Sequence, residues 1–199
     1  ECIEIGKRPP QNAIKVDSLL PAVANLHSHA FQRAMAGMTE YRAKSQDSFW
    51  TWRTLMYRFL DQLTPEHIEA IAGQVFMEML EAGYASVGEF HYVHHQSGGA
   101  HYESQTELSD RILGAARETG IGLTHLPVLY TYGGAGQQAL VGGQSRFGRS
   151  VDQFANLMQG LQSKMSDSNP DTVLGIAPHS LRATAPDELD SVTAAFGDG

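Results

Sequence analysis

The stretch AVANLHSHAFQRAMAG, residues 22–37, decides between the folds open to this 199-residue chain. Its apolar start, residues 22–26, is typical of a short buried strand, and a polar turn follows. Two histidines, His27 and His29, stand one residue apart where this strand ends. Side chains at positions i and i+2 of a strand point to the same face, so the two imidazoles can reach one common point.

Beyond this stretch, strand-like and helix-like segments alternate. Apolar residues recur at helical spacing, and Thr64-Pro65 is a typical helix start. The predicted strands are 22–26, 84–90, 121–130 and 173–177, and the predicted helices are 65–82, 106–119, 151–165 and a last one starting at Pro186. Strict alternation of this kind indicates an α/β fold with a parallel sheet and right-handed crossovers.

Two parallel architectures compete, and the first turn discriminates between them. A doubly wound sheet normally carries a phosphate-binding G-x-G-x-x-G turn after its first strand, whereas residues 27–32 read HSHAFQ. We therefore favour a (β/α)8 TIM-like barrel. A whole barrel takes roughly 250 residues and eight strand–helix units, so only about the first half, four βα units, is present.

Composition limits the possible partners and the compartment. The formal net charge of −8 argues against a nucleic-acid partner, because an acidic chain lacks the basic stripe that neutralises phosphates. No apolar run approaches the roughly 20 residues that cross a bilayer, so we expect no membrane association. The single cysteine, Cys2, excludes an internal disulfide framework and fits the reducing cytoplasm.

The histidine pair has a metal-binding interpretation and a structural one. Imidazole nitrogens bind zinc at about 2.0–2.1 Å, and a catalytic zinc keeps about three protein ligands and one open position. Nine histidines among 199 residues produce roughly 0.4 such pairs by chance, so the spacing alone is weak. Its position is more informative, because active sites of these barrels lie at the carboxyl ends of the strands.

The places of the other histidines and of one aromatic stretch along the chain predict different roles for them. His179 ends the fourth strand and is expected on the same functional rim. His91 ends the second strand, and its side chain either faces the site or makes a structural hydrogen bond. His94 and His95 lie in a polar loop and are expected to be solvated. The aromatic-rich stretch 49–59 is expected to form a packed lid or an oligomer contact.

Four motifs resemble the formimidoylglutamate deiminases, a family within the metal-dependent amidohydrolase superfamily. They are NLHSHAFQRAMAG at 25–37, DSFWTWRTLMYRFL at 47–60, EMLEAGYASVGEFHY at 78–92 and APHSLRA at 177–183. The likeness runs over nearly the whole chain and implies a barrel of the metal-dependent hydrolase type. It further implies that residues 1–20 end a truncated N-terminal β-rich segment and that 21–199 form the first half of the catalytic barrel, with the C-terminal half missing.

The resemblance also implies a role for individual residues. His27 and His29 would be two ligands of one Zn²⁺ per chain, and iron or manganese would be alternatives because two imidazoles select zinc weakly. The substrate-binding residues would be Gln32, Arg53, Tyr92, His179 and Arg182. The other metal ligands and the general acid and base are expected beyond residue 199, so this stretch holds no catalytic residue and should be inactive alone.

The implied reaction is hydrolysis of N-formimino-L-glutamate to N-formyl-L-glutamate and ammonia, a step of histidine degradation. Two arginines suit a small dicarboxylate, because a guanidinium grips a carboxylate through paired hydrogen bonds. We also expect a homo-oligomer, namely a dimer. Two alternatives stay open: another deaminase of the superfamily that acts on a cyclic substrate, and a non-catalytic, metal-free barrel relative.

Overall fold

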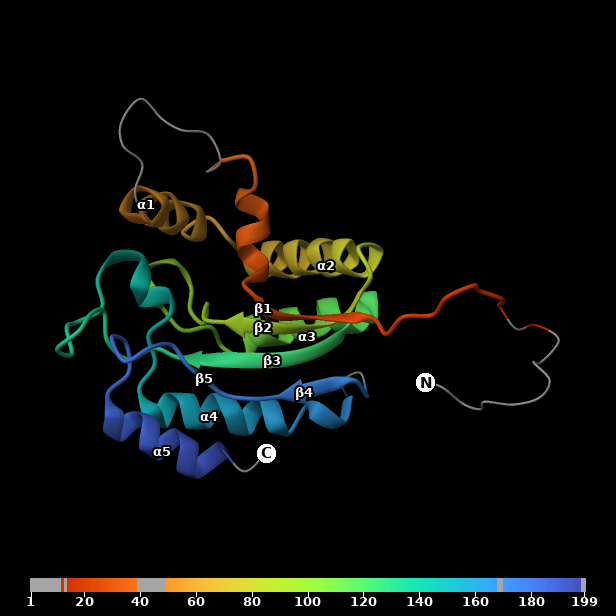
Figure 1. Cartoon of the computed structure of the whole chain (residues 1–199). Helices are drawn as coiled ribbons and strands as arrows, with labels where there is room; N and C mark the ends of the chain where they lie inside the picture. The colour runs from red at the N-terminus through yellow and green to blue at the C-terminus, as the bar shows by residue number, and fades with distance from the viewer. Residues whose placement is uncertain (1–11, 13, 39–48, 168–169, 198–199) are drawn as a thin grey trace.

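The computed structural model describes residues 12, 14–38, 49–167 and 170–197, which form one parallel sheet with helices packed around it (Figure 1). The strands are β1 Val23–Ser28, β2 Tyr84–His91, β3 Gly122–Leu129, β4 Thr172–Leu174 and β5 Ala177–Pro178. The α-helices are α1 Phe49–Leu60, α2 Pro65–Glu81, α3 Glu107–Thr119, α4 Val151–Gln162 and α5 Pro186–Phe196. Short 3-10 turns are η1 Ala30–Met35, η2 Ser97–Gly99, η3 Gly142–Arg146 and η4 Met165–Asp167.

The order of the strands excludes a doubly wound sheet. Neighbours run β1-β2-β3-β4 in chain order, β5 also pairs with β3, and all the pairings are parallel. A doubly wound sheet reverses its order at a switch point, whereas an unbroken order with right-handed crossovers keeps all helices on one face. The predicted α/β fold is therefore confirmed, and its topology is that of half a barrel.

Most of the predicted elements are confirmed to within a few residues. Helix α2 begins where expected, since Thr64 Oγ1 accepts the backbone N–H of His67 and the His67 ring accepts that of Thr64, a reciprocal capping box. The predicted strand 173–177 is two short strands, β4 and β5, separated at Gly175. Helix α1 lies in the aromatic-rich stretch, for which no element was predicted.

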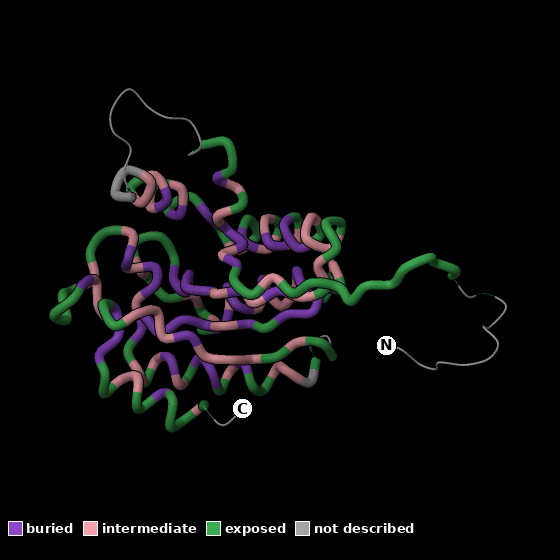
Figure 2. Tube along the Cα trace, in the orientation of Figure 1, coloured by how far each residue is buried: buried purple, intermediate pink, exposed green. Residues whose placement is uncertain are grey.

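The core lies between the outer face of the sheet and the helices. Val87 on β2 and Leu123 on β3 belong to one buried cluster with Phe76 of α2 and Ile112 of α3. A smaller cluster joins β3 to α4 and α5. In Figure 2 the buried positions accordingly follow the central strands and the inward sides of the helices.

The two outer strands of the sheet expose apolar side chains. Leu26 and Val23 of β1 are 84% and 60% exposed, and Val173 of β4 is 59% exposed. The expected N-terminal segment 1–20 stays a prediction: residues 1–11 and 13 lie outside the described part, and 12 and 14–20 form no helix or strand there. No helix in the described ranges is long and apolar enough to cross a membrane.

Candidate metal and substrate site

The two histidines converge at the carboxyl end of β1. The Nε2 atoms of His27 and His29 lie 3.1 Å apart, and the ring planes are inclined at 84°. Two nitrogens that ligate one tetrahedral zinc at about 2.0–2.1 Å each would be about 3.3–3.4 Å apart. The pair therefore fits two ligands of a single cation. Within the described residues, no group of three or more His, Cys, Asp or Glu side chains is arranged to hold a metal.

The ring of His29 is oriented by the neighbouring strand. Its Nδ1 lies 3.0 Å from the carbonyl oxygen of Phe90 on β2, which can only accept, so Nδ1 carries the proton. This tautomer leaves the Nε2 lone pair free for a cation. Burial is the main cause that lowers the pKa of His29, and the nearby His27 lowers it further. Both effects favour the neutral imidazole that metals bind.

A cavity of about 200 Å³ opens beside His29, and we call it the rim cavity. All five residues expected to bind substrate line it: Gln32, Arg53, Tyr92, His179 and Arg182. They come from η1, α1, the end of β2 and the loop after β5, so segments up to 150 residues apart meet at one place. The remaining lining residues are Trp52, Met56, Tyr57, Tyr130 and Phe147.

The polar lining residues are held by hydrogen bonds to one another. Gln32 Nε2 donates to the Tyr92 hydroxyl at 2.9 Å, and Tyr92 is buried, which raises the pKa of its hydroxyl. Arg53 Nε donates to the Tyr57 hydroxyl at 2.7 Å, with the guanidinium 5.2 Å from that ring's centroid. The cavity therefore presents a neutral donor pair on one side and a guanidinium on another.

The opposite part of the lining is formed by the loop after β5. His179 packs edge-on against Tyr130, with ring centroids 4.6 Å apart, and its Nδ1 lies 3.1 Å from Ser180 Oγ. Burial lowers the pKa of His179 to about 4, and the positive charge of Arg182 contributes. His179 is consequently neutral at pH 7. Arg182 is exposed at the mouth of the cavity, where a charged ligand would arrive.

Several expectations about other residues were wrong or incomplete. His94 and His95 are buried rather than solvated, because their Nε2 atoms bond the carbonyls of Val128 and Gly148. For His91, where two alternatives were open, the structure favours the structural one: the side chain does not line the rim cavity, and its buried ring lies 5.4 Å from that of His125. Tyr57 was missed as a lining residue, although its spacing of four from Arg53 could have indicated a shared helix face.

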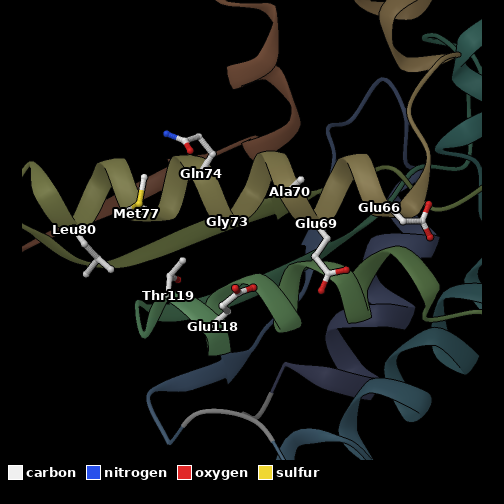
Figure 3. Close-up of a pocket in the computed structure, with 9 residues that line it drawn as sticks. All are labelled: Glu66, Glu69, Ala70, Gly73, Gln74, Met77, Leu80, Glu118 and Thr119. Atoms are coloured by element: carbon white, nitrogen blue, oxygen red, sulfur yellow. The ribbon is translucent and has the colours of Figure 1, made fainter.

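A second groove lies on the helical layer, between α2 and α3 (Figure 3). Glu69 of α2 and Glu118 of α3 point into it, and its volume is about 680 Å³. Arg111 bonds Glu69 at 2.8 Å and Glu66 at 3.3 Å. None of the residues expected to bind metal or substrate lines this groove, so it is distinct from the rim cavity.

The amino-acid sequence is similar to that of known proteins. Residues 18–196 match the model of the amidohydrolase family. The formimidoylglutamate deiminase of Pseudomonas aeruginosa is 49% identical over 195 residues, which cover 96% of this chain and 43% of that enzyme. The chain thus spans less than half the length of this relative.

Solved structures show the same fold. A crystal structure of an amidohydrolase from Brucella melitensis is 50% identical with a TM-score of 0.85, covering 89% of this chain and 40% of its own. A variant of atrazine chlorohydrolase from Arthrobacter aurescens, complexed with zinc and atraton, has a TM-score of 0.64 at 18% identity, covering 89% and 39%. At that identity the likeness concerns the fold alone.

Proposed function

The chain belongs to the amidohydrolase family, and from that premise we propose that it is part of a zinc-dependent formimidoylglutamate deiminase. This enzyme would hydrolyse N-formimino-L-glutamate to N-formyl-L-glutamate and ammonia in histidine degradation. The observation that carries the proposal is the rim cavity, in which Arg53 and Arg182 accompany three neutral polar side chains beside His29. The relative from Pseudomonas aeruginosa carries the name of this activity.

The metal would be held by His27 and His29, whose Nε2 atoms are 3.1 Å apart; the tautomer of His29 leaves its Nε2 free for a cation. A zinc ion bound by such ligands supplies a water-derived nucleophile at neutral pH. Iron or manganese would fit the same two imidazoles. The remaining ligands and the general acid and base would come from outside residues 1–199.

Substrate recognition would rest on charge and shape. The two carboxylates of formimidoylglutamate would be bound by Arg53 and Arg182, each through paired, charge-assisted hydrogen bonds. Gln32 and Tyr92, joined by their own hydrogen bond, would contact the formimino end together with the neutral His179. Such positioning holds the reacting carbon at a fixed point and thereby lowers the entropic part of the barrier.

The deciding experiment is an ammonia-release assay on the full-length protein with formimidoylglutamate, formimidoylaspartate and several cyclic imines. We expect release from formimidoylglutamate, with slower release from the shorter analogue. Release from the cyclic substrates alone would point instead to a deaminase acting on a ring. A folded protein without metal would point to a non-catalytic relative. We also propose that the enzyme is cytoplasmic and that it forms a homo-oligomer. Gel filtration of the full-length protein tests the oligomeric state.

A further inference from the structure

A buried carboxylate holds the backbone around His29. Glu89 on β2 is 1% exposed, and its Oε1 accepts the backbone N–H of Ala30 at 2.8 Å. The side chain of Ser28 also interacts with this carboxylate and lowers the pKa of Glu89. Ser28 and Ala30 are the residues on either side of His29, so one side chain fixes the chain before and after the imidazole.

The next residue along β2 fixes the ring itself. The carbonyl of Phe90 accepts from His29 Nδ1 at 3.0 Å. Residues 89 and 90 therefore restrain His29 in two ways, through its backbone and through its side chain. Loss of a group that orients a metal-ligating imidazole in this way typically weakens metal binding about 10–100-fold.

The carboxylate at this position is costly for the fold. Burial raises the pKa of Glu89 to about 7, and Oε2 has no hydrogen-bond partner among the described residues. Val87, two residues earlier on the same face of the strand, is an equally buried apolar residue. An apolar residue at 89 would avoid the desolvation penalty. The carboxylate is therefore better explained by its contacts with the residues beside His29 than by a contribution to the stability of the fold.

We propose that Glu89 is a positioning residue of the metal site, which aims His29 Nε2 at the cation by holding Ser28 and Ala30. This inference rests on the proposed function, because it takes His27 and His29 as metal ligands. It concerns a residue that touches neither the cation nor the rim cavity. Its effect should therefore appear in metal affinity before it appears in substrate binding.

The test is zinc affinity of the full-length protein, measured by competition with a chelator. Glu89→Met keeps the size and removes both acceptors, so we expect binding about 10–100-fold weaker. Glu89→Gln keeps an acceptor oxygen for Ala30 and Ser28 and should restore affinity close to that of the unmodified protein. Val87→Ala is the matched control: it destabilises the same strand, touches none of these bonds, and should bind zinc normally.

Equal zinc affinity in Glu89→Met and Val87→Ala would overturn the inference. If Glu89→Met does not fold, Ser28→Ala removes one of the two held groups, and unchanged affinity in this variant would overturn it equally. The ammonia assay separates the two proposals. If Glu89→Met binds zinc weakly but neither it nor the unmodified protein releases ammonia, only the proposed function is refuted. If the unmodified protein releases ammonia and Glu89→Met binds zinc as tightly as it does, only the role of Glu89 is refuted.

Discussion

The protonation of one nitrogen determines whether His29 can serve as a ligand. Because its Nδ1 donates to Phe90, His29 keeps the lone pair of its Nε2 free, and the Nε2 of His27 lies 3.1 Å from it. We expect about one zinc per chain in the full-length protein, and we expect His27→Ala to lose it, since a two-imidazole pair cannot form. Elemental analysis measures this. His67→Ala, at the exposed start of α2, is the control and should keep the metal.

The recognition of a dicarboxylate can be tested at Arg182. Arg182→Lys keeps the positive charge but loses the planar fork that binds a carboxylate through two parallel bonds. We expect KM for formimidoylglutamate to rise about tenfold or more, which corresponds to about 1.4 kcal/mol of lost binding. Steady-state kinetics measure it. An unchanged KM would favour a substrate without two carboxylates.

The interior histidines make stability depend on pH. His125 is fully buried, both of its ring nitrogens lack partners among the described residues, and burial lowers its pKa to about 3 from an ordinary 6.5. Between pH 3 and pH 6.5, His125 therefore binds a proton in the unfolded chain but stays neutral in the folded chain. Stability from this residue is therefore complete above pH 6.5 and is lost as the pH falls toward 3.

We accordingly expect His125→Leu, a substitution of similar size, to lose less stability than the unmodified protein between pH 8 and pH 5. One histidine with this pKa shift lowers the free energy of unfolding by about 2 kcal/mol at pH 5. Urea denaturation at both pH values measures the difference. A variant at an exposed histidine, His101→Leu, should follow the unmodified protein at both. Equal acid sensitivity of His125→Leu would contradict the expectation.

The sequence was informative about site residues that carry an obvious chemistry. His29 and Arg182 were predicted from their motifs, and the structure places both at the rim cavity. Glu89 was not predicted, because its role depends on a hydrogen bond to a residue 59 positions earlier. His94 was assigned to solvent because its neighbours are polar, and only the packing of β3 beneath it explains its burial.

Among the elements, amphipathic helices were the easiest to predict. Helix α2 has apolar residues at helical spacing, Thr64 at its start and a glycine after its end, so local signals agree. Helix α1 was not predicted because the aromatic-rich stretch was interpreted as a lid or an oligomer contact, although Met56 and Leu60, both buried, recur at helical spacing. The division between β4 and β5 at Gly175 reflects pairing with β3 at two separate places, which no local pattern records.

Helix α1 depends on a buried arginine for its position. The guanidinium of Arg146 is fully buried and donates to the carbonyls of Leu60, Leu63 and His95, which join the end of α1 to two loops. Replacing it by methionine removes a donor from all three carbonyls, of which only that of Leu60 keeps a backbone partner, the N–H of Leu63, within the described part of the chain. We expect Arg146→Met to lower the free energy of unfolding by about 3 kcal/mol or more.

The same variant should also raise KM, because α1 carries Arg53 into the rim cavity. Urea denaturation and steady-state kinetics on the full-length protein measure the two effects. Arg58→Met, at an exposed position of α1, is the control and should change neither. A normal KM in a destabilised Arg146→Met would mean that α1 keeps its place without this anchor.

For the whole molecule, the sheet ends at two strands with exposed apolar side chains. We expect residues 1–199 produced alone to release no ammonia from formimidoylglutamate and to bind a hydrophobic dye through surfaces that include Leu26 and Val173. The full-length protein should release ammonia and bind less dye. Ammonia release by the isolated chain would show that the catalytic groups lie within these 199 residues.

The restraint of His29 by β2 has a consequence for the order of assembly during synthesis. Phe90 lies 61 positions after His29, and Glu89 lies 59 positions after Ala30. A nascent chain that has not yet released β2 from the ribosome therefore has both imidazoles but neither restraint. Metal binding should therefore follow the pairing of β2 with β1. We expect a nascent chain stalled on the ribosome before that point to bind zinc weakly through His27 and His29.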